Sequence, residues 1–554
     1  MEKLIAQTQA FLNHIPGPGK LLFGGLTADR QAFRSLAACL LAIVATNLMP
    51  PVINLGSPPI EQGLRQVGSG VPALIAANYL LLAILTLAAG ATGDGVGRKL
   101  FLLIGLGGVL FAALASMFWL GTDGFIYADL LLSMARITIA PMCIAIAAFT
   151  FAPGVRPFAF GAIFSTQAIA LGSSSALYSL LKPVGNGTIV YLLPITFGVI
   201  AFRLILHRVN EPVEQQRIVW RELLVNLLWA GAVFLAVYGL VAYAGGLTSR
   251  NALLTIAIGL GGLILMYRYF YRKLRRRGEI KLYNGRGLAF AILAGMSLAM
   301  VQATLFYQFW SYFADVRRLG PVATTLQFAP FVVGMLVGTL LIVRLSTRFG
   351  ARRLIAGGLV LSALGLLALS RIQVDTPLAF LVLPIAVLGL GLGISGPART
   401  SVIISAPPPR LIGSGAAINS AAGQSGYALG VIASSFLVTM LADGALRTRL
   451  QQANLPGDVM TQIESVWKSA FARALSGTNT GLPPEAAQWA TTQFGPAFTS
   501  GLAQTLLILA GFVTVAAIVI FVGMPRGLRG SLITPEQMLA NAPEEPGATA
   551  GTTG

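Results

Sequence analysis

Long apolar runs recur along this 554-residue chain, and they constrain its fold more than any other feature. A helix needs roughly 20 apolar residues to cross a bilayer, and we count fourteen such runs between Leu36 and Gly523. Six precede His207, two lie at 223–243 and 253–271, and six follow Arg286. Because lipid offers the backbone no hydrogen-bond partners, such runs favour helices. We therefore expect an all-α polytopic membrane protein with fourteen transmembrane helices.

The composition excludes an ordinary soluble protein. Charged residues make up 10% of the chain, hydrophobic residues 55%, and the mean hydropathy is +0.77, whereas soluble domains are about 25% charged. The net charge of +19 comes from basic residues concentrated in the loops and tails of one face. This bias follows the positive-inside rule. It predicts a multi-pass membrane protein with both termini in the cytoplasm, and it argues for lipid and against nucleic acid as a partner.

The residues that hold metals, disulfides or nucleotides are sparse. Cys39 and Cys143 fall inside predicted spans, and His14 and His207 lie far apart in a tail and a loop. Neither a disulfide framework nor a metal site is expected from them, and no nucleotide-binding loop is present. We expect no metal and no cofactor, and the alternative of a membrane enzyme or sensor on a transporter-like frame is disfavoured.

Two short charged stretches between apolar runs correspond to one another. In residues 90–99, GATGDGVGRK, the glycines permit a tight reversal and a close approach of backbones. Asp94 is placed to meet the amides of a nearby helix N-terminus, and Arg98 and Lys99 are expected on the watery side. Residues 344–353, RLSTRFGARR, echo this pattern about 250 residues later, with Thr347 at the position of the acid. Two such halves are typical of alternating-access transporters.

The runs and loops divide the chain into five parts. We predict a cytoplasmic tail at 1–34, an N-terminal six-helix bundle at 35–206, two inserted helices with a basic loop at 207–286, a C-terminal six-helix bundle at 287–524 and a disordered cytoplasmic tail at 525–554. The C-terminal bundle includes a long outer loop, 443–500. Within it, apolar residues at helical spacing over 459–474 predict a helix that either lies on the membrane or a partner, or caps its own outer helices.

Ionisable residues inside spans are the first candidates for function. Arg136 lies within the fourth run, where a charge costs at least about 2.5 kcal/mol on insertion scales. Asp129 precedes it by seven residues, or two helical turns, so both share roughly one face. We expect Arg136 to face a central cavity and Asp129 to be the best available proton carrier or counter-charge, although Asp129 is close enough to the outer turn to be simply solvated. Asp315 is a second candidate acid.

Uncharged polar and aromatic groups at membrane depth are the next candidates. Each polar group either hydrogen-bonds a ligand in a cavity or ties one helix to another. Together with Arg136, the predicted cavity residues are Asn47, Asn78, Tyr79, Gln167, Gln302, Gln308, Asn419 and Gln424. Near them, Phe306, Phe309, Trp310 and Phe313 form either an aromatic cavity wall or an interfacial belt.

The stretch at 90–99 resembles the loop between the second and third helices of major facilitator superfamily transporters. The order of spans, Tyr79–Leu82 running into Gly90 and Asp94, and the glycine-rich segment 412–426 are similar to the fourteen-span drug:proton antiporter branch. Some positions depart from that pattern: Ala42 stands where the branch has an acid in the first span, and 169–175 lacks the Gly-Pro signature of the fifth.

The resemblance implies a major facilitator fold with two six-helix bundles and two inserted helices. It implies an inner-membrane exporter of amphipathic or aromatic small molecules, driven by proton antiport with alternating access. It also implies a conformational gate, formed by Gly90, Asp94, Gly97, Arg98, Lys99, Arg348, Gly350 and Arg352. Members of the branch often work with a periplasmic adaptor and an outer-membrane channel, and the outer loop would then be the docking surface. The missing acid leaves open a dedicated siderophore or metabolite exporter with altered or absent proton coupling.

Overall fold

The computed structural model describes residues 30–48, 71–118, 122–152, 154–181, 191–209, 261, 285–407, 411–452, 457, 460–461 and 484–525. These residues are almost entirely helical, and none of them forms a strand. The helices of the first half are α3 (Arg30–Asn47), α5 (Val71–Val96), α6 (Arg98–Phe118), α7 (Thr122–Thr150), α8 (Arg156–Leu181) and α9 (Leu192–Arg208). Those of the second half are α13 (Arg286–Ser311), the π-helix η3 (Tyr312–Val316), α14 (Pro321–Leu326), α15 (Ala329–Arg348), α16 (Ala351–Leu369), α17 (Leu378–Ile404), α18 (Ile412–Gln452) and α20 (Pro484–Gly523).

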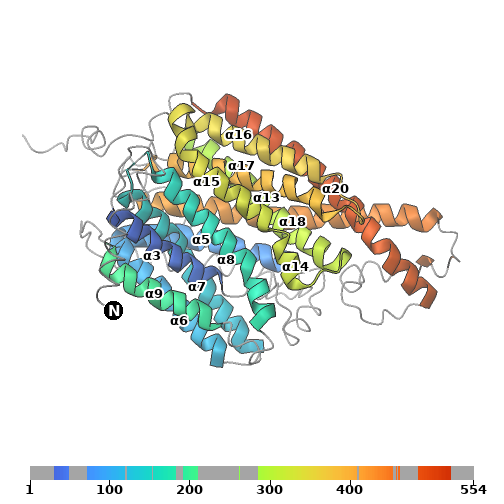
Figure 1. The fold of residues 1–554 in the computed structure, drawn as a ribbon, viewed down its shortest axis with the longest axis horizontal. Coiled ribbons are helices and arrows are strands. Elements are labelled where there is room, and N and C mark those ends of the chain that lie inside the picture. The colour runs from blue at the N-terminus through green and yellow to red at the C-terminus, as the bar shows by residue number, and fades with distance from the viewer. Residues whose placement is uncertain are drawn as a thin grey trace, which may run out of the picture.

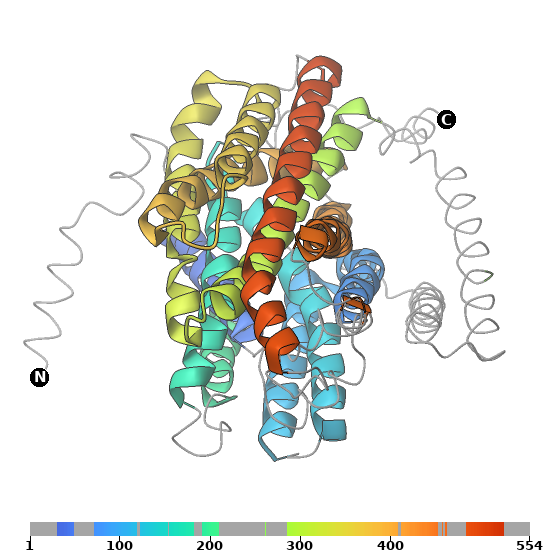
Figure 2. The same ribbon diagram turned by 90° about the vertical axis from the view of Figure 1, so that its right-hand side faces the viewer.

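The two sets of helices form two groups that lie side by side. In Figure 1 the blue-to-green helices of the first half occupy one side of the molecule and the yellow-to-red helices the other. The halves meet where α5 packs on α18 and where α8 packs on α15 and α17; Figure 2 shows α18, in orange, beside α5, in blue. The predicted two-bundle architecture of the major facilitator fold is therefore present.

The outer surface of both groups is apolar, as a lipid environment requires. Eight helices of the described residues are long and apolar enough to cross a membrane, and two shorter apolar helices accompany them. Large hydrophobic side chains such as Phe118, Phe380 and Val522 are more than 70% exposed on these helices. The chain is thus a multi-pass membrane protein. The inserted helices predicted at 223–243 and 253–271 lie outside the described residues, so the count of fourteen stays a prediction.

The predicted loop at 90–99 is mostly helical. Helix α5 continues to Val96 and α6 begins at Arg98, so the reversal is made at Gly97 alone, with φ of 107°. Only glycine adopts this backbone conformation without strain. The other glycines of the stretch serve packing instead: a Cβ on Gly90 would meet the Gly413 carbonyl oxygen of α18 at 2.7 Å.

Helices also replace other predicted loops and tails. Helix α3 begins at Arg30, inside the predicted tail. Helix α18 continues to Gln452 and α20 begins at Pro484, so both ends of the predicted outer loop 443–500 are helical, and Figure 1 shows the two helices projecting together beyond the others. Their extensions are held by buried Leu446 and Leu450 and by the contact of Arg449 with Gln493 Oε1 at 3.0 Å. Most of 459–474, both tails beyond α3 and α20, and the basic loop before α13 lie outside the described residues.

Candidate functional site

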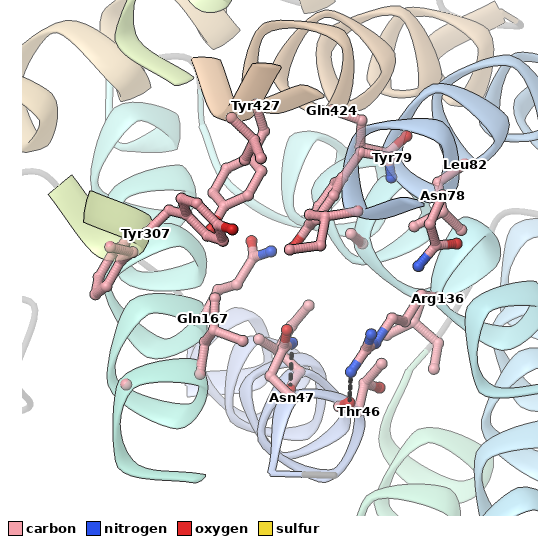
Figure 3. Close-up of a pocket in the computed structure, with 18 of the residues that line it drawn as sticks. Thr46, Asn47, Asn78, Tyr79, Leu82, Arg136, Gln167, Tyr307, Gln424 and Tyr427 are labelled. Atoms are coloured by element: carbon pink, nitrogen blue, oxygen red, sulfur yellow. Dashed lines mark hydrogen bonds between the residues drawn. The ribbon is translucent and has the colours of Figure 1, made fainter. Parts of the chain in front are cut away.

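A cavity of about 160 Å³ lies between the two halves. The first half supplies α3, α5, α7 and α8 to its wall, and the second half supplies α13, the turn before α15, and α18. Figure 3 shows the polar side chains pointing inward from both sides. The lining residues that carry the argument below are Thr46, Asn47, Asn78, Tyr79, Arg136, Gln167, Phe306, Tyr307, Trp310, Phe328, Gln424 and Tyr427.

Arg136 lies on the wall of this cavity, from the middle of α7. Its Nη2 donates to the Thr46 carbonyl oxygen of α3 at 3.4 Å, as the dashed line in Figure 3 marks. Its Nε is buried without a hydrogen-bond partner among the described residues. The guanidinium thus faces the space between the halves rather than lipid, and it keeps hydrogen-bonding capacity that a ligand can use.

Five of the predicted uncharged residues line the same cavity: Asn47, Asn78, Tyr79, Gln167 and Gln424. The Asn47 amide donates to Ile43 O at 2.9 Å, and Gln424 Oε1 accepts from Thr86 Oγ1 at 3.1 Å. The rings of Tyr79 and Tyr427 face each other across the two halves, with centroids 4.3 Å apart. The cavity wall is therefore amphipathic, with aromatic faces beside amide groups.

A second cavity of about 150 Å³ adjoins the first and shares Tyr79, Gln167, Gln424 and Tyr427 with it. Gln302 and Asn419, also predicted, line this one. So does Arg399 of α17, which the sequence analysis did not single out. Its charge lies near the end of an apolar run that contains two prolines. The run extends to Ile404, five residues further, and that length was the available signal.

Arg399 is 7% exposed and belongs to a polar cluster. Its Nη1 donates to Asn419 Oδ1 at 2.7 Å, and Thr400 Oγ1 donates to the same oxygen at 3.0 Å. Its Nε is buried and has no hydrogen-bond partner among the described residues, while the Phe164 ring lies 5.9 Å away. A second guanidinium is thus held at the space between the halves.

Gln308 differs from the other predicted cavity residues. It is 3% exposed, lines neither cavity, and donates to Ser434 Oγ at 3.1 Å and Ser435 Oγ at 3.2 Å. Its placement in the cavity was therefore wrong, and its hydrogen bonds tie α13 to α18 instead. Burial between two packed helices leaves an amide no access to a ligand, which spacing in the sequence does not reveal.

The four predicted aromatic residues also fall into two sets, one that lines a cavity and one that is buried. Phe306 and Trp310 line the first cavity together with Phe328, and the Trp310 and Phe328 rings stack at 6.5 Å. Phe309 and Phe313 are fully buried, so an interfacial belt is wrong for this pair. One helical face thus forms the cavity wall, and the other packs within the second half.

No carboxylate lines either cavity among the described residues. Asp129 lies in α7, two turns before Arg136, and its side chain falls outside the description. Asp315 lies in η3 and is not part of either wall. The described charge on the cavity walls is entirely cationic.

Asp94 joins the halves at the end of α5, as predicted. Its Oδ1 accepts from the Gly413 amide at 2.8 Å, and its Oδ2 accepts from the Ser414 amide at 2.7 Å and from Ser414 Oγ at 2.8 Å. These groups begin α18, where unpaired amides favour an anion. Arg98 Nη2 binds the same carboxylate at 2.7 Å.

The neighbours of Asp94 correct one expectation. Arg98 is 7% exposed and its guanidinium lies 4.2 Å from the centre of the Phe149 ring, so it is not on the watery side. Pairing with a buried carboxylate accounts for this burial, because an unpaired charge there would be costly. Lys99 donates to Leu206 O of α9 at 2.8 Å. We call Asp94, Gly413 and Ser414 the carboxylate latch.

The second hairpin, between α15 and α16, carries Arg348, Gly350 and Arg352. Arg348 is exposed, and Gly350 precedes the first residue of α16. Arg352 Nη1 donates to Met524 O at 3.3 Å, and its guanidinium lies 4.5 Å from the centre of the Phe521 ring. These contacts stay within the second half.

Comparisons with known proteins agree with this fold. Residues 299–442 match the Major Facilitator Superfamily sequence model. The chain is 23% identical over 494 residues to the tetracenomycin C resistance and export protein of Streptomyces glaucescens, covering 88% of this chain and 90% of that protein. It is 24% identical over 519 residues to the multidrug efflux pump LfrA of Mycolicibacterium smegmatis, covering 90% and 97%. The solved proton:xylose symporter XylE superposes with a TM-score of 0.55 at 12% identity, covering 92% of this chain and 98% of that one.

Proposed function

We propose that this chain, which has the fold of the major facilitator superfamily, is a secondary active exporter of amphipathic or aromatic small molecules. The observation that carries the proposal is the cavity between the halves, whose wall combines Arg136, amide side chains and aromatic rings. Such a wall suits organic molecules with an apolar body and a few polar groups. The names of the two relatives, one an export protein and one an efflux pump, favour export over uptake.

The carboxylate latch supports alternating access. It closes α5 onto α18 through hydrogen bonds to main-chain amides, which a rigid rotation of the halves would break together. In this proposal the latched form is one end state, and its release opens the cavity at the hairpin end. The basic loops favour a cytoplasmic position for that end in the inner membrane.

Proton antiport is the proposed source of energy. Coupling of transport to the proton gradient requires a group in the pathway that takes up and releases a proton. Asp129, on the same helix as Arg136, is the proposed carrier. Neutralisation of Asp129 would leave Arg136 without its nearest acid along α7. We also propose that the projecting ends of α18 and α20 form the docking surface for an adaptor protein.

Flux in reconstituted vesicles tests the function. The full chain is incorporated into liposomes that contain a pH-sensitive dye, and efflux of an aromatic dye is followed with and without an imposed pH gradient. We expect gradient-driven efflux with matching proton movement, and about a tenfold loss of both in Arg136→Gln, as for removal of one charged hydrogen-bond donor. Flux that ignores the gradient would reject antiport, and absence of any flux over empty liposomes would reject the transporter.

A further inference from the structure

We propose that the second cavity is an anion site and that the cargo is an aromatic organic acid, bound through its carboxylate or sulfonate by Arg399. The inference rests on the proposed function, since it names the substrate class of the same pathway. Its argument comes from the charge, hydrogen bonding and aromatic content of the described cavity walls.

The first step is the charge of the walls. The two cavities share part of their lining and carry Arg136 and Arg399, with no acidic side chain among the described residues of either wall. In a low-dielectric space, like charges repel far more strongly than in water. An organic cation would meet two guanidiniums and no described carboxylate, whereas an anion would neutralise a charge that is already there.

The second step is the state of Arg399. The side chain is 7% exposed, and its Nε has no hydrogen-bond partner in the described part of the chain. The partner of its Nη1 is the neutral Asn419 amide oxygen. A buried guanidinium is normally matched by a carboxylate, which accepts two parallel N–H bonds. The described protein supplies no such acceptor, and the cavity beside it is where a ligand would supply one.

The third step is the shape of the site around the guanidinium. A Cβ on Gly295 of α13 would lie 2.6 Å from Arg399 Nη1, so this glycine leaves room for the fork. Phe164 lies beside the guanidinium, and Tyr79 and Tyr427 line the same cavity. The rings offer faces to an aromatic body while its acidic group binds Arg399. A hydrogen bond that only joined two helices would not require a cavity with aromatic walls beside the guanidinium.

Three probes that share a naphthyl ring but differ in charge test the wild-type protein for an anion site. Naphthylacetate, its methyl ester and naphthylmethylammonium are titrated calorimetrically into the purified full chain in detergent, with empty micelles subtracted. We expect the carboxylate to bind at least about tenfold tighter than the ester, and the cation to bind weakest. Equal binding of the three, or tighter binding of the cation, overturns the proposal. No gradient is involved, so this result is independent of the antiport test.

Variants then assign the preference to Arg399. Arg399→Gln is expected to remove the carboxylate's advantage over the ester and leave ester binding unchanged, and Arg399→Lys to keep part of it. Gly295→Ala, which retains the charge but crowds the fork, is expected to weaken the carboxylate selectively. The exposed Arg447, paired with Asp443, provides the matched control Arg447→Gln, with no effect. An equal loss for carboxylate and ester in Arg399→Gln would mean a structural role and would reject the site. Should that variant fail to fold, the wild-type series and Gly295→Ala still decide.

Discussion

The two hairpins of similar sequence make different contacts. The α5–α6 hairpin reaches the other half, where Asp94 accepts three hydrogen bonds from Gly413 and Ser414. In the α15–α16 hairpin, Arg352 instead contacts Met524 and the Phe521 ring within its own half. The two hairpins therefore correspond in sequence but differ in their contacts, and they differ at one position of chemical consequence: Asp94 in the first corresponds to Thr347 in the second.

The opposite junction between the halves is neutral by comparison. There α8 meets α15 through Ser165 Oγ and Thr339 Oγ1, 3.3 Å apart, and through Gly161 packed on the Thr339 side chain. Small residues of this kind allow close packing without charge. The molecule thus has a charged junction at α5–α18 and a neutral one at α8–α15, and we expect the charged one to control opening at the hairpin end.

The largest effect is expected for Asp94→Ala, which removes the acceptor of the latch. Asp94 accepts three hydrogen bonds from α18, and each contributes at least about 1 kcal/mol, so their loss shifts the balance between latched and open forms by at least about a hundredfold. Vesicle flux should fall by about that factor. The matched control is Asp443→Asn, in an exposed i,i+4 pair with Arg447, which should transport normally. Unchanged flux in Asp94→Ala would remove the latch from the mechanism.

Gly90→Val is expected to have the next largest effect, because it separates α5 from α18 sterically. An added Cβ would collide with Ala417 and with the Gly413 carbonyl oxygen, and overpacking of this kind costs about 1–3 kcal/mol. We expect about a tenfold loss of flux and a lower melting temperature. Gly95→Val, at a position of the same helix with open space around it, provides the control for helix propensity. Equal losses in both variants would show that packing against α18 is not the cause.

A smaller effect is expected for Ser414→Ala. This variant removes the hydroxyl bond to Asp94 Oδ2 but leaves both amide bonds of the latch. One hydrogen bond contributes about 1 kcal/mol, so flux should fall by about fivefold. A loss as large as that of Asp94→Ala would instead mean that the hydroxyl, and not the main chain, carries the latch.

The smallest effect on transport is expected for Arg352→Gln, because the described contacts of Arg352 lie within the second half. Its contacts with Met524 and Phe521 stabilise the packing of α16 on α20, so a thermal-unfolding assay should show a loss of about 1 kcal/mol. Flux measured at a temperature where the variant is folded should stay within about twofold of the wild type. A loss of flux like that of Asp94→Ala would erase the difference between the hairpins.

Much of the fold was predictable because a lipid bilayer requires membrane-spanning segments to be helical, apolar and of a characteristic length. Apolar runs predicted the helices of both halves, and a charge in the middle of a run marked Arg136. Turns were harder. Gly90 and Gly97 look alike in sequence, yet one packs against α18 and the other makes the reversal, because the difference depends on the neighbouring helix.

The site was predictable only in part, for a related reason. Helical spacing identifies residues at membrane depth but not the direction in which each one faces once two halves are packed. Gln424 therefore lines a cavity while Gln308 is buried between helices. Arg399 was missed although it lies inside an apolar run, because it is five residues from the end of that run, where basic side chains usually belong to the adjoining loop.

The central claim is that the carboxylate latch holds the two halves closed at the hairpin end. Spin labels on the exposed positions Leu100 of α6 and Phe349 after α15, one in each half, report the distance between the halves by pulsed electron resonance; the native Cys39 and Cys143 are buried. The account predicts one short distance in the labelled wild type and an added population of longer distances in Asp94→Ala. The same single distance in both proteins would contradict it.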